Sequence, residues 1–328
     1  MSKKLSKQKL NDIITYGIVI AAFVIMQILI NAGEISSLFQ GLMVPLCTYI
    51  ILAISLNLVV GILGELSLGH AGFMCVGAFT SSFFSKAMQD TITNSTVRFL
   101  LALLIGIITA AIFGIIIGIP VLRLNGDYLA IVTLAFGEII KNLVNVLFIG
   151  KDSKGFHFST KDAVSLNMEP DGKIILNGPQ GITGTPNDST FFIGFILILV
   201  TLFIVLNLIH SRDGRAIMAI RDNRIAAESI GINITKYKLM TFTISAAMAG
   251  AAGVLYAHNL SNLTANTNNF GYNMSINILV FVVLGGIGNI RGSIIAAVVL
   301  TLLPELLRGM SDYRMLIYAI VLIVMMLF

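Results

Sequence analysis

Charged side chains are scarce in this sequence. Of its 328 residues, 11% are charged and 56% are hydrophobic, whereas a soluble globular protein carries about 25% charged residues. Four stretches contain no Asp, Glu, Lys or Arg: Ile13–Gly33, Ile35–Gly64, Phe99–Leu122 and Leu239–Ile290. Each is long enough to cross a bilayer as a helix, which takes about 20 apolar residues. The sequence therefore predicts a polytopic membrane protein and excludes a soluble enzyme.

Other residue types that mark particular functions are also few. The two cysteines lie in apolar runs and the four histidines have no metal-ligand spacing, which argues against a disulfide framework or a metal centre. The 21 Lys and Arg residues are too scattered for a nucleic-acid surface. No Gly-x-x-x-x-Gly-Lys-Ser/Thr phosphate loop occurs. If the protein uses ATP, hydrolysis is therefore expected on another polypeptide.

The apolar runs predict an all-α fold with eight to ten transmembrane helices in a single domain over residues 1–328. Four lysines in residues 1–12 precede a first run too long for a cleavable signal, so we expect it to remain as an anchor. The ten candidate segments are roughly 13–31, 38–61, 71–88, 98–120, 128–149, 191–210, 239–258, 276–290, 293–307 and 315–328. The last three are short and interrupted by glycine.

The distribution of Lys and Arg between the loops predicts the orientation, because cytoplasmic loops are enriched in both. Residues 1–12 and the loop 211–238 are basic and fall on the same side, so both are expected to be cytoplasmic. The loop 151–190 then lies outside the cell and could dock an external partner or serve only as a connector. Its Gly178–Pro186 stretch is dense in Gly and Pro, which predicts turns rather than helix or strand.

Glycine clusters interrupt two of the apolar segments, at Gly61–Gly72 and at Leu284–Gly292. Helices break or approach closely at such places, and paired broken helices point to the pathway of a transporter. At an offset of 220 residues, Ser, Asn, Val and Gly recur between the two regions, which suggests a parallel internal repeat. The candidates for the translocation pathway are Glu65, Ser67, Gly69, His70, Thr133, Gly285, Gly286, Gly288 and Asn289.

A few ionisable residues lie near or within the apolar segments. An ionisable group inside a membrane is costly and by default functional, but Glu65, His70 and Asp127 are expected at the cytoplasmic interface instead. Glu138 and Lys141 lie three residues apart on one predicted helix, where they can pair. His258 ends a segment and is also expected to be interfacial.

The loop 211–238 carries a short helical signal. Ile217, Ile220 and Ala227 recur at helical spacing. Asn223 is a candidate N-cap and Gly231 a candidate residue just past the C-terminus, which predicts a helix of about two turns. Such a helix is too short to be stable alone, so it needs a surface, which a soluble partner would supply. The alternative is an amphipathic linker.

From about residue 45 to its end, the chain resembles the LivM-like permease subunits of branched-chain amino acid ABC transporters. Four motifs carry the resemblance: Gly64-Glu-Leu-Ser-Leu-Gly-His-Ala-Gly-Phe73, the stretch Leu122–Glu138, Gly214-Arg-Ala-Ile-Met-Ala-Ile-Arg-Asp-Asn223 and Val283-Leu-Gly-Gly-Ile-Gly-Asn289. The chain departs from these relatives at Glu65, where Gln is common, at Asn125, where Arg is common, and at Ile225, where the coupling loop usually has Glu.

The resemblance implies a function and a set of partners. It implies an importer subunit in a bacterial plasma (inner) membrane, with a second LivH-like permease, two cytoplasmic ATPases that hold ATP and Mg, an external substrate-binding protein and no cofactor on this chain. It also implies contact with the ATPases through Gly214, Arg215, Arg221, Asn223, Ala226, Ala227, Glu228 and Gly231. The alternatives are a permease for urea, short amides or other small solutes, a secondary transporter driven by an ion gradient, and an intramembrane enzyme using His70.

Overall fold

A computed structural model describes residues 7–33, 36–124, 126–170, 172–309 and 313–327. Helices dominate it, and ten of those within the described residues coincide with the ten predicted apolar segments. They are α1 (Lys7–Asn31), α2 (Ser37–Asn57, continued by the π-helix η1, Leu58–Leu63), α3 (His70–Ala87), α4 (Ser95–Val121), α5 (Asp127–Val146), α6 (Phe191–His210), α9 (Ile234–Ala257), α11 (Tyr272–Leu284), α12 (Ile290–Leu306) and α13 (Arg314–Leu327).

Six of these helices are long and apolar enough to cross a membrane. They are α1, α2 with η1, α4, α5, α6 and α9, and they confirm an all-α polytopic membrane protein. The other four helices, α3, α11, α12 and α13, have 18, 13, 17 and 14 residues. Whether each of these spans the membrane stays a prediction.

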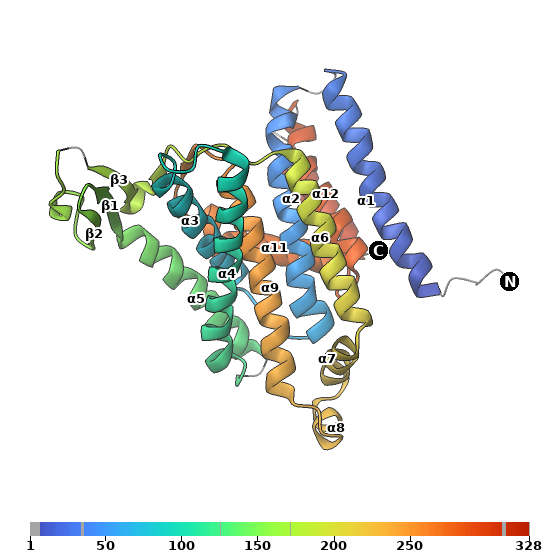
Figure 1. The fold of residues 1–328 in the computed structure, drawn as a ribbon. Coiled ribbons are helices and arrows are strands. Elements are labelled where there is room, and N and C mark those ends of the chain that lie inside the picture. Colours follow the sequence, from blue (N-terminus) through green and yellow to red (C-terminus); the bar gives the residue numbers. More distant parts are fainter. Residues whose placement is uncertain (1–6, 34–35, 125, 171, 310–312, 328) are drawn as a thin grey trace.

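Helix α2 occupies the centre of the bundle (Figure 1). Its spanning window is 94% buried, against 11% for α1 and 28% for α4 and α6. It packs against α6, α9, α11 and α12. Its polar residues Thr48, Ser55 and Asn57 are fully buried, as expected because polar groups within a membrane face the interior of a bundle. The peripheral helix α1 instead keeps most of its apolar surface exposed.

Helices α3, α4 and α9 meet at three glycines, and we call this contact the glycine crossing. A Cβ atom on Gly77 of α3 would lie 2.3 Å from the carbonyl oxygen of Gly250 in α9. A Cβ atom on Gly250 would in turn lie 2.9 Å from the carbonyl oxygen of Gly106 in α4. Since no side chain fits at these positions, the backbones themselves are in contact, as in other membrane helix interfaces built on small residues.

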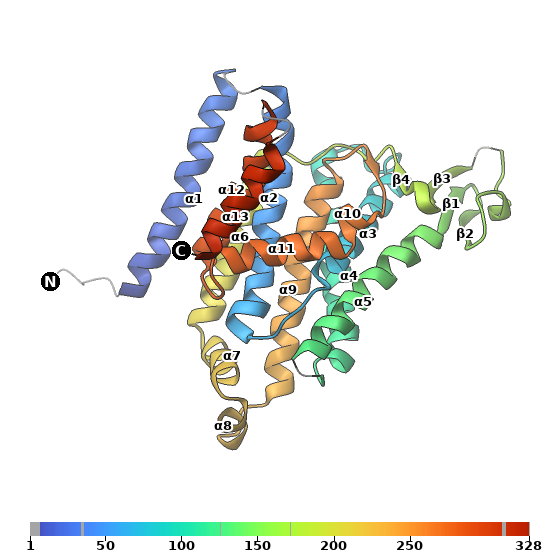
Figure 2. The same cartoon turned by 180° about the vertical axis from the view of Figure 1, so that it is seen from behind.

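Helix α11 lies across the bundle rather than along it (Figure 2). Its 13 residues span about 20 Å at 1.5 Å per residue, less than the roughly 30 Å of a hydrocarbon core. Its neighbour α12 begins after the second glycine cluster. The internal repeat stays a prediction, and two of its matched positions differ in environment: Asn57 is buried, whereas Asn277 is exposed.

The predicted outer loop is ordered and contains short strands. Its elements and their neighbours are β1 (Phe148–Asp152), β2 (Gly155–Ser159), the 3-10 helix η2 (Val164–Leu166), β3 (Lys173–Asn177), the 3-10 helix η3 (Gly178–Gln180) and β4 (Ile182–Thr183). The first sheet has the antiparallel order β2-β1-β3, and β4 pairs with β5 (Asn262–Leu263). The prediction of turns alone over Gly178–Pro186 was wrong, because residues 80 positions further along the chain supply the partner strand of β4.

Polar contacts fasten this loop to the ends of α3 and α4. Lys86 donates to the carbonyl oxygen of Ile174 at 3.0 Å, and Lys151 donates to that of Ala87 at 2.9 Å. A nearly buried ion pair joins Arg98 to Asp188 at 2.8 Å. Two further helices, α7 (Arg212–Asp222) and α8 (Arg224–Ser229), lie at the opposite end of the bundle (Figure 1). The chain is completed by α10 (Thr267–Phe270) and the 3-10 helix η4 (Leu307–Gly309).

Candidate functional site

The predicted short helix in the loop 211–238 is present as α8. The Asn223 side chain accepts a hydrogen bond from the Ala226 amide at 3.0 Å and caps the helix. Gly231 follows the helix with a φ of 85°, the left-handed conformation that glycine adopts most easily. Sequence reasoning missed α7, which precedes α8 and begins at the Ser211 cap, where the hydroxyl accepts from the Gly214 amide at 3.0 Å.

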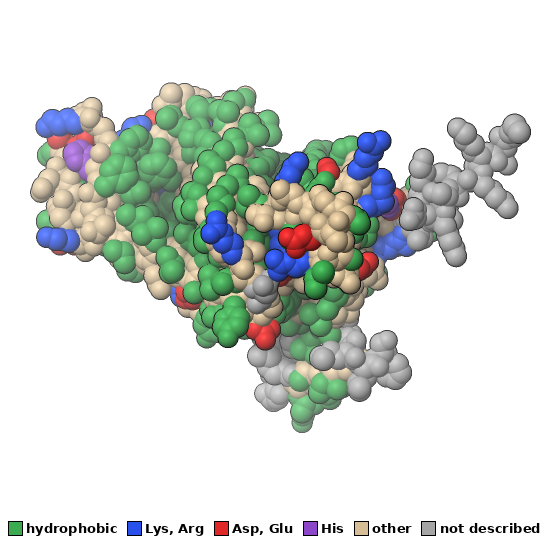
Figure 3. All heavy atoms as spheres, turned by 90° about the horizontal axis from the view of Figure 1, so that it is seen from below, with side chains coloured by type: hydrophobic (Ala, Val, Ile, Leu, Met, Phe, Trp, Pro, Cys, Tyr) green, Lys and Arg blue, Asp and Glu red, His purple; other side chains and the backbone are tan. Residues whose placement is uncertain are grey.

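Helix α8 protrudes from the bundle and is held by a small apolar contact. Ala227 is buried against Ile220 of α7 and Ile234 of α9, whereas the other five residues of α8 are exposed. Ile225 is 81% exposed and Ile230, just beyond the helix, is 75% exposed. Viewed from this end (Figure 3), charged and hydrophobic side chains gather over the protruding helices. An apolar tip exposed among charges is typical of a surface that contacts another protein.

The remaining coupling candidates position these two helices. Gly214 lets α7 turn back against α6, because a Cβ atom there would lie 2.1 Å from the Leu208 carbonyl oxygen. Arg215 donates to the carbonyl oxygen of His210 at 3.3 Å, which fixes the same turn. Glu228 is exposed on α8.

Arg221 connects this surface to the centre of the bundle. Its guanidinium donates to the carbonyl oxygen of Gly61 in η1 at 3.0 Å and also contacts Asp222 at 2.9 Å. In a π-helix each backbone hydrogen bond spans one residue more than in an α-helix. Here η1 ends at Leu63 and is followed by Gly64, whose φ is 79°, and the Gly61 carbonyl is bound by a side chain from α7.

Asn57 joins this point to the second glycine cluster. Its side-chain oxygen accepts from the Gly288 amide at 2.9 Å, and its side-chain amide donates to the Ser293 hydroxyl at 2.8 Å. Gly61 lies against Gly288, since a Cβ atom on Gly61 would be 2.3 Å from the Gly288 nitrogen. The two broken segments, more than 200 residues apart in sequence, therefore meet beside Arg221. Sequence reasoning missed Asn57 as a connecting residue, although an isolated Asn in an apolar run was a usable signal.

The pathway candidates around the first break form one group. Thr133 of α5 accepts from the Leu68 amide at 3.0 Å, and a Cβ atom on Gly69 would lie 2.2 Å from the Thr133 carbonyl oxygen. Ser67, His70 and Thr133 are buried. The Nε2 atom of His70 lies 2.6 Å from the Ser55 hydroxyl inside the bundle. That His70 lies at the depth of the membrane interface stays a prediction. Asp127 is exposed at the start of α5.

Glu65 forms an ion pair with Lys238 of α9. The Lys238 residue is only 2% exposed, although its sequence context suggested an ordinary cytoplasmic lysine. The pair fastens the connection between η1 and α3 to α9. Lys238 is thus a residue of this site that sequence reasoning missed.

The candidates at the second break have two roles in the structure. Gly285 and Gly292 pack against each other, because a Cβ atom on Gly292 would lie 1.6 Å from the Gly285 carbonyl oxygen. Gly286 and Gly288 have φ values of 89° and 83°, which form the turn before α12. Asn289 caps α12 and accepts from the Gly292 amide at 3.3 Å.

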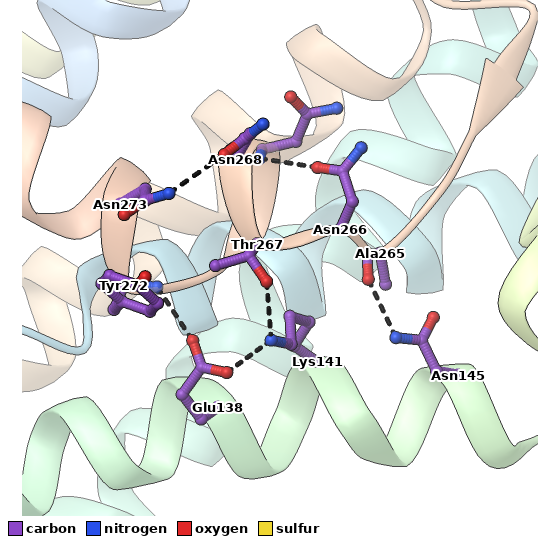
Figure 4. Close-up of polar contacts among 10 residues, drawn as sticks. Glu138, Lys141, Asn145, Ala265, Asn266, Thr267, Asn268, Tyr272 and Asn273 are labelled. Atoms are coloured by element: carbon purple, nitrogen blue, oxygen red, sulfur yellow. Dashed lines mark hydrogen bonds and ion pairs between the residues drawn. The ribbon is translucent and has the colours of Figure 1, made fainter.

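A second polar cluster joins α5 to the segment before α11 (Figure 4). The predicted pairing of Glu138 with Lys141 is confirmed. Glu138 also accepts from the Tyr272 amide at 2.9 Å, and Lys141 donates to the Thr267 hydroxyl at 3.1 Å. The carboxylate thereby caps the N-terminus of α11, where a negative charge is favourable.

His258 follows α9 as its C-cap, and its interfacial position stays a prediction. It is fully buried, with Nδ1 3.0 Å from the Val254 carbonyl oxygen. The Phe99 ring of α4 packs edge-on against the imidazole at a centroid distance of 5.2 Å. The covering ring comes from another helix, so the position of His258 at a segment end gave no sign of its burial.

Together, the spanning helices, the two broken segments that meet at their glycines and the protruding helix pair define a polytopic transport protein of the permease type. The chain belongs to the family described as the branched-chain amino acid transport system, permease component, which it matches over residues 37–328.

Curated relatives extend this assignment. The chain is 35% identical over 288 residues to the high-affinity branched-chain amino acid transport system permease protein LivM of Salmonella typhimurium. The matched region covers 85% of this chain and 66% of that relative. The chain is 27% identical to the LivH permease protein of the same organism (77% of this chain, 79% of that relative) and 27% identical to the fructose import permease protein FruG of Bifidobacterium longum (84% and 76%). No solved structure matches the chain significantly.

Proposed function

We propose that this chain is a membrane-spanning permease subunit of an ATP-binding cassette importer for branched-chain amino acids, that it forms part of the translocation pathway and that it is not itself an enzyme. Its partners are a second, LivH-like permease, two ATPase subunits that bind ATP and Mg²⁺, and an external substrate-binding protein. Family membership and the similarity to both LivM and LivH support this assembly.

The observation that carries the proposal is the link from the exposed helix α8 to the broken helix. Ala227 attaches α8 to α7, and Arg221 of α7 binds the Gly61 carbonyl next to Gly288. A force applied to α8 from outside the membrane therefore reaches both glycine breaks through three consecutive contacts. A channel, or a carrier driven by an ion gradient, does not need an exposed helix pair that connects a soluble partner to the broken helices.

The proposed cycle is alternating access. The external protein delivers substrate at the end of the bundle that carries the strands. When the ATPases close on ATP, they displace α8 and α7, and Arg221 moves Gly61 and its neighbour Gly288 with them. The breaks then rearrange and open the pathway. ATP drives the change because the ATPases bind the two conformations with different affinities.

The same arrangement supports the proposed orientation in a bacterial plasma membrane. The N-terminal part of α1 lies on the side of α7, since Asp12 is 3.5 Å from His210. Asp12 and the 211–238 segment therefore share one side of the bundle. The basic residues of that segment favour the cytoplasm for this side, and the strand-bearing loop then faces outward.

One observation favours a second substrate class. A fructose import permease is among the similar proteins, so we also consider a sugar as substrate. The buried polar groups near the first break, Ser55, His70 and Thr133, suit neither substrate uniquely. Uptake of radiolabelled leucine, isoleucine, valine and fructose into cells that lack their own carriers decides between the two classes.

The test of the whole assignment is purification of the tagged chain from its native membrane, with mass spectrometry of the proteins recovered. We expect a second permease and an ATPase. Ile225→Asp in α8 should release the ATPase, because it places a charge on the exposed apolar tip. The matched control is Val164→Asp, since Val164 is 84% exposed and lies in the outer loop.

Two outcomes would overturn the proposal. One is recovery of the chain alone, with uptake that persists after ATP depletion and stops when the ion gradient is collapsed. The other is equal loss of the ATPase in both Asp variants, which would mean that α8 is not the contact.

A further inference from the structure

The peripheral helix α1 contacts the bundle at several points along its length. Toward one end, Phe23 stacks on Phe195 and Phe191 of α6, with centroid distances of 3.9 Å and 5.2 Å. Toward the other end, Asp12 lies 3.5 Å from His210, and the Arg291 guanidinium donates to the Thr15 hydroxyl. Between them, Tyr16 and Val19 pack against the edge of the core, and α1 lies at the periphery of the bundle (Figure 1).

A crevice of about 430 Å³ separates α1 from α2, α6 and α12. Its lining side chains are apolar and include Val19, Met26, Ile50, Ile198, Ile294 and Val298. Helices α1 and α6 are both long enough to span the membrane, so the crevice lies at the depth of the lipid chains.

A second cavity of about 400 Å³ lies beside α7. We call it the polar cavity, because charged side chains line it among apolar ones. The same helices line both spaces: on α12, Arg291 faces the polar cavity and Ile294 the crevice. On α1, Thr15 faces the cavity and Ile18 the crevice. One groove thus runs along α1, polar at one end and apolar along the rest.

The polar end contains two guanidinium groups. Arg221 and Arg291 line it together with His210, and Asp12 is the acidic residue that lines it with them. A second carboxylate, that of Asp222, contacts the Arg221 guanidinium. Guanidinium groups bind phosphate oxygens through directed hydrogen bonds, and basic pockets between membrane helices bind anionic lipid headgroups.

The length of the groove matches one leaflet. From Thr15 to Met26 the helix rises about 16 Å at 1.5 Å per residue, and half of a hydrocarbon core is about 15 Å. We propose that this groove binds one anionic phospholipid from the leaflet on the α7 side. Its phosphate lies beside Arg291 and Arg221, and one acyl chain fills the crevice between α1 and α12.

The chemistry of the groove favours a lipid over a helix of another subunit. A transmembrane helix would need apolar contacts along its whole length and would leave two guanidinium groups against its flank. An anionic phospholipid combines a phosphate at one end with an acyl chain along the rest. The inference is independent of the transported substrate.

The test measures lipid retained by the purified full-length chain, together with any subunits that purify with it. The protein is reconstituted in nanodiscs of phosphatidylethanolamine containing about one fifth phosphatidylglycerol, re-extracted in detergent and examined by native mass spectrometry, with extracted lipid counted per chain. We expect one phosphatidylglycerol per chain, enriched over its share of the bilayer.

Two variants with matched controls locate the site. Arg291→Gln removes a charge at the polar end, and Arg123→Gln removes one from the exposed turn between α4 and α5. Ala22→Phe fills the crevice that Ala22 lines, and Ala21→Phe adds the same ring to the neighbouring exposed residue. We expect Arg291→Gln and Ala22→Phe to lose at least fivefold of the retained lipid, and the two controls to keep it.

Three results would overturn the proposal: no retained phospholipid, retention of both lipids in proportion to the bilayer, or equal loss in variants and controls. A disulfide or cross-link from position 22 to another subunit in native membranes would assign the groove to a protein partner and also contradict it. Thermal unfolding of each variant separates loss of the site from loss of the fold.

Discussion

The guanidinium of Arg221 donates a hydrogen bond of 3.0 Å to the carbonyl oxygen of Gly61. This contact joins a side chain of the exposed helix α7 to the π-helix η1, which continues the central helix α2. The Gly61 carbonyl is accessible to α7 because it lies in the last turn of η1, which ends at Leu63. A single side chain thereby connects the surface to the first of the two breaks.

Replacing Arg221 should uncouple ATP hydrolysis from uptake. A hydrogen bond from a charged donor contributes about 1.5–3 kcal/mol, so we expect Arg221→Ala to lower the substrate transported per ATP hydrolysed about tenfold or more. Uptake and hydrolysis are measured on the same proteoliposomes of the purified transporter. Arg123→Ala is the control, and an unchanged ratio in Arg221→Ala would refute the role of this contact.

The meeting of the two breaks leaves no room for a methyl group at Gly61. Its Cβ atom would lie 2.0 Å from Asn57 Oδ1 and 2.3 Å from the Gly288 nitrogen. Overpacking of this kind costs about 1–3 kcal/mol, so Gly61→Ala should lower the Tm. Gly41→Ala, in the same helix with nothing within 4 Å of the new methyl, should leave it unchanged or raise it.

The two cysteines provide the measurement of Tm. Cys47 and Cys75 are both free and buried, so a thiol-reactive fluorophore reports the exposure of the core as the helices separate. Equal Tm values for Gly61→Ala and the unmodified chain would show that the two breaks do not pack as described.

The ion pair of Glu65 with Lys238 should show strong coupling. Removing one partner of a buried pair costs about 3–5 kcal/mol, because the other charge is left uncompensated. Lys238→Met and Glu65→Gln should therefore each lower the Tm, and the double variant should be more stable than Lys238→Met alone. Additive effects in this double-mutant cycle would argue against the pair.

Asp152 should control the order of the β1–β2 hairpin. Its carboxylate accepts from the Lys154 amide at 2.8 Å and lies 2.9 Å from His157 Nε2. Loss of solvent contact raises its pKa, but hydrogen bonds from the Lys154 and Glu169 amides and from His157 lower the pKa by more, so it lies below the ordinary value of 3.8.

This shift determines how the hairpin responds to pH. Because the folded pKa is depressed, the stabilisation is complete above pH 3.8 and is lost as the pH falls through the lower folded value. Asp152→Ala should remove it at neutral pH, seen as faster proteolysis within residues 153–170. Asp127→Ala is the control, because Asp127 is exposed at the start of α5 and lies outside this loop. Equal cleavage rates in the two variants would contradict this role.

Local signals were sufficient to predict some of these elements from the sequence. The N-cap Asn223 and the glycine at 231 both act within a few residues, so α8 was predicted correctly. The apolar runs likewise predicted the long helices. The strands of the outer loop were missed because their pairing depends on distant segments: β4 pairs with β5, about 80 residues later.

The site was harder to predict than the fold, because its contacts join distant parts of the chain. Glycine clusters indicated where the helices break but gave no sign that Gly61 meets Gly288 through Asn57. Lys238 looked like a solvated basic residue until the fold placed Glu65 beside it. His70 lies inside the bundle because Ser55, on another helix, binds its ring.

The glycine crossing of α3, α4 and α9 has a consequence for how the protein moves. With their backbones in contact at Gly77, Gly106 and Gly250, these helices cannot slide past one another without a steric clash, so we expect them to move as one rigid body. The hinges of the molecule then lie elsewhere, at the turns around residues 64–69 and 285–289. We therefore expect α3, α4 and α9 to keep their relative positions during transport, while α11 and α12 change position against them.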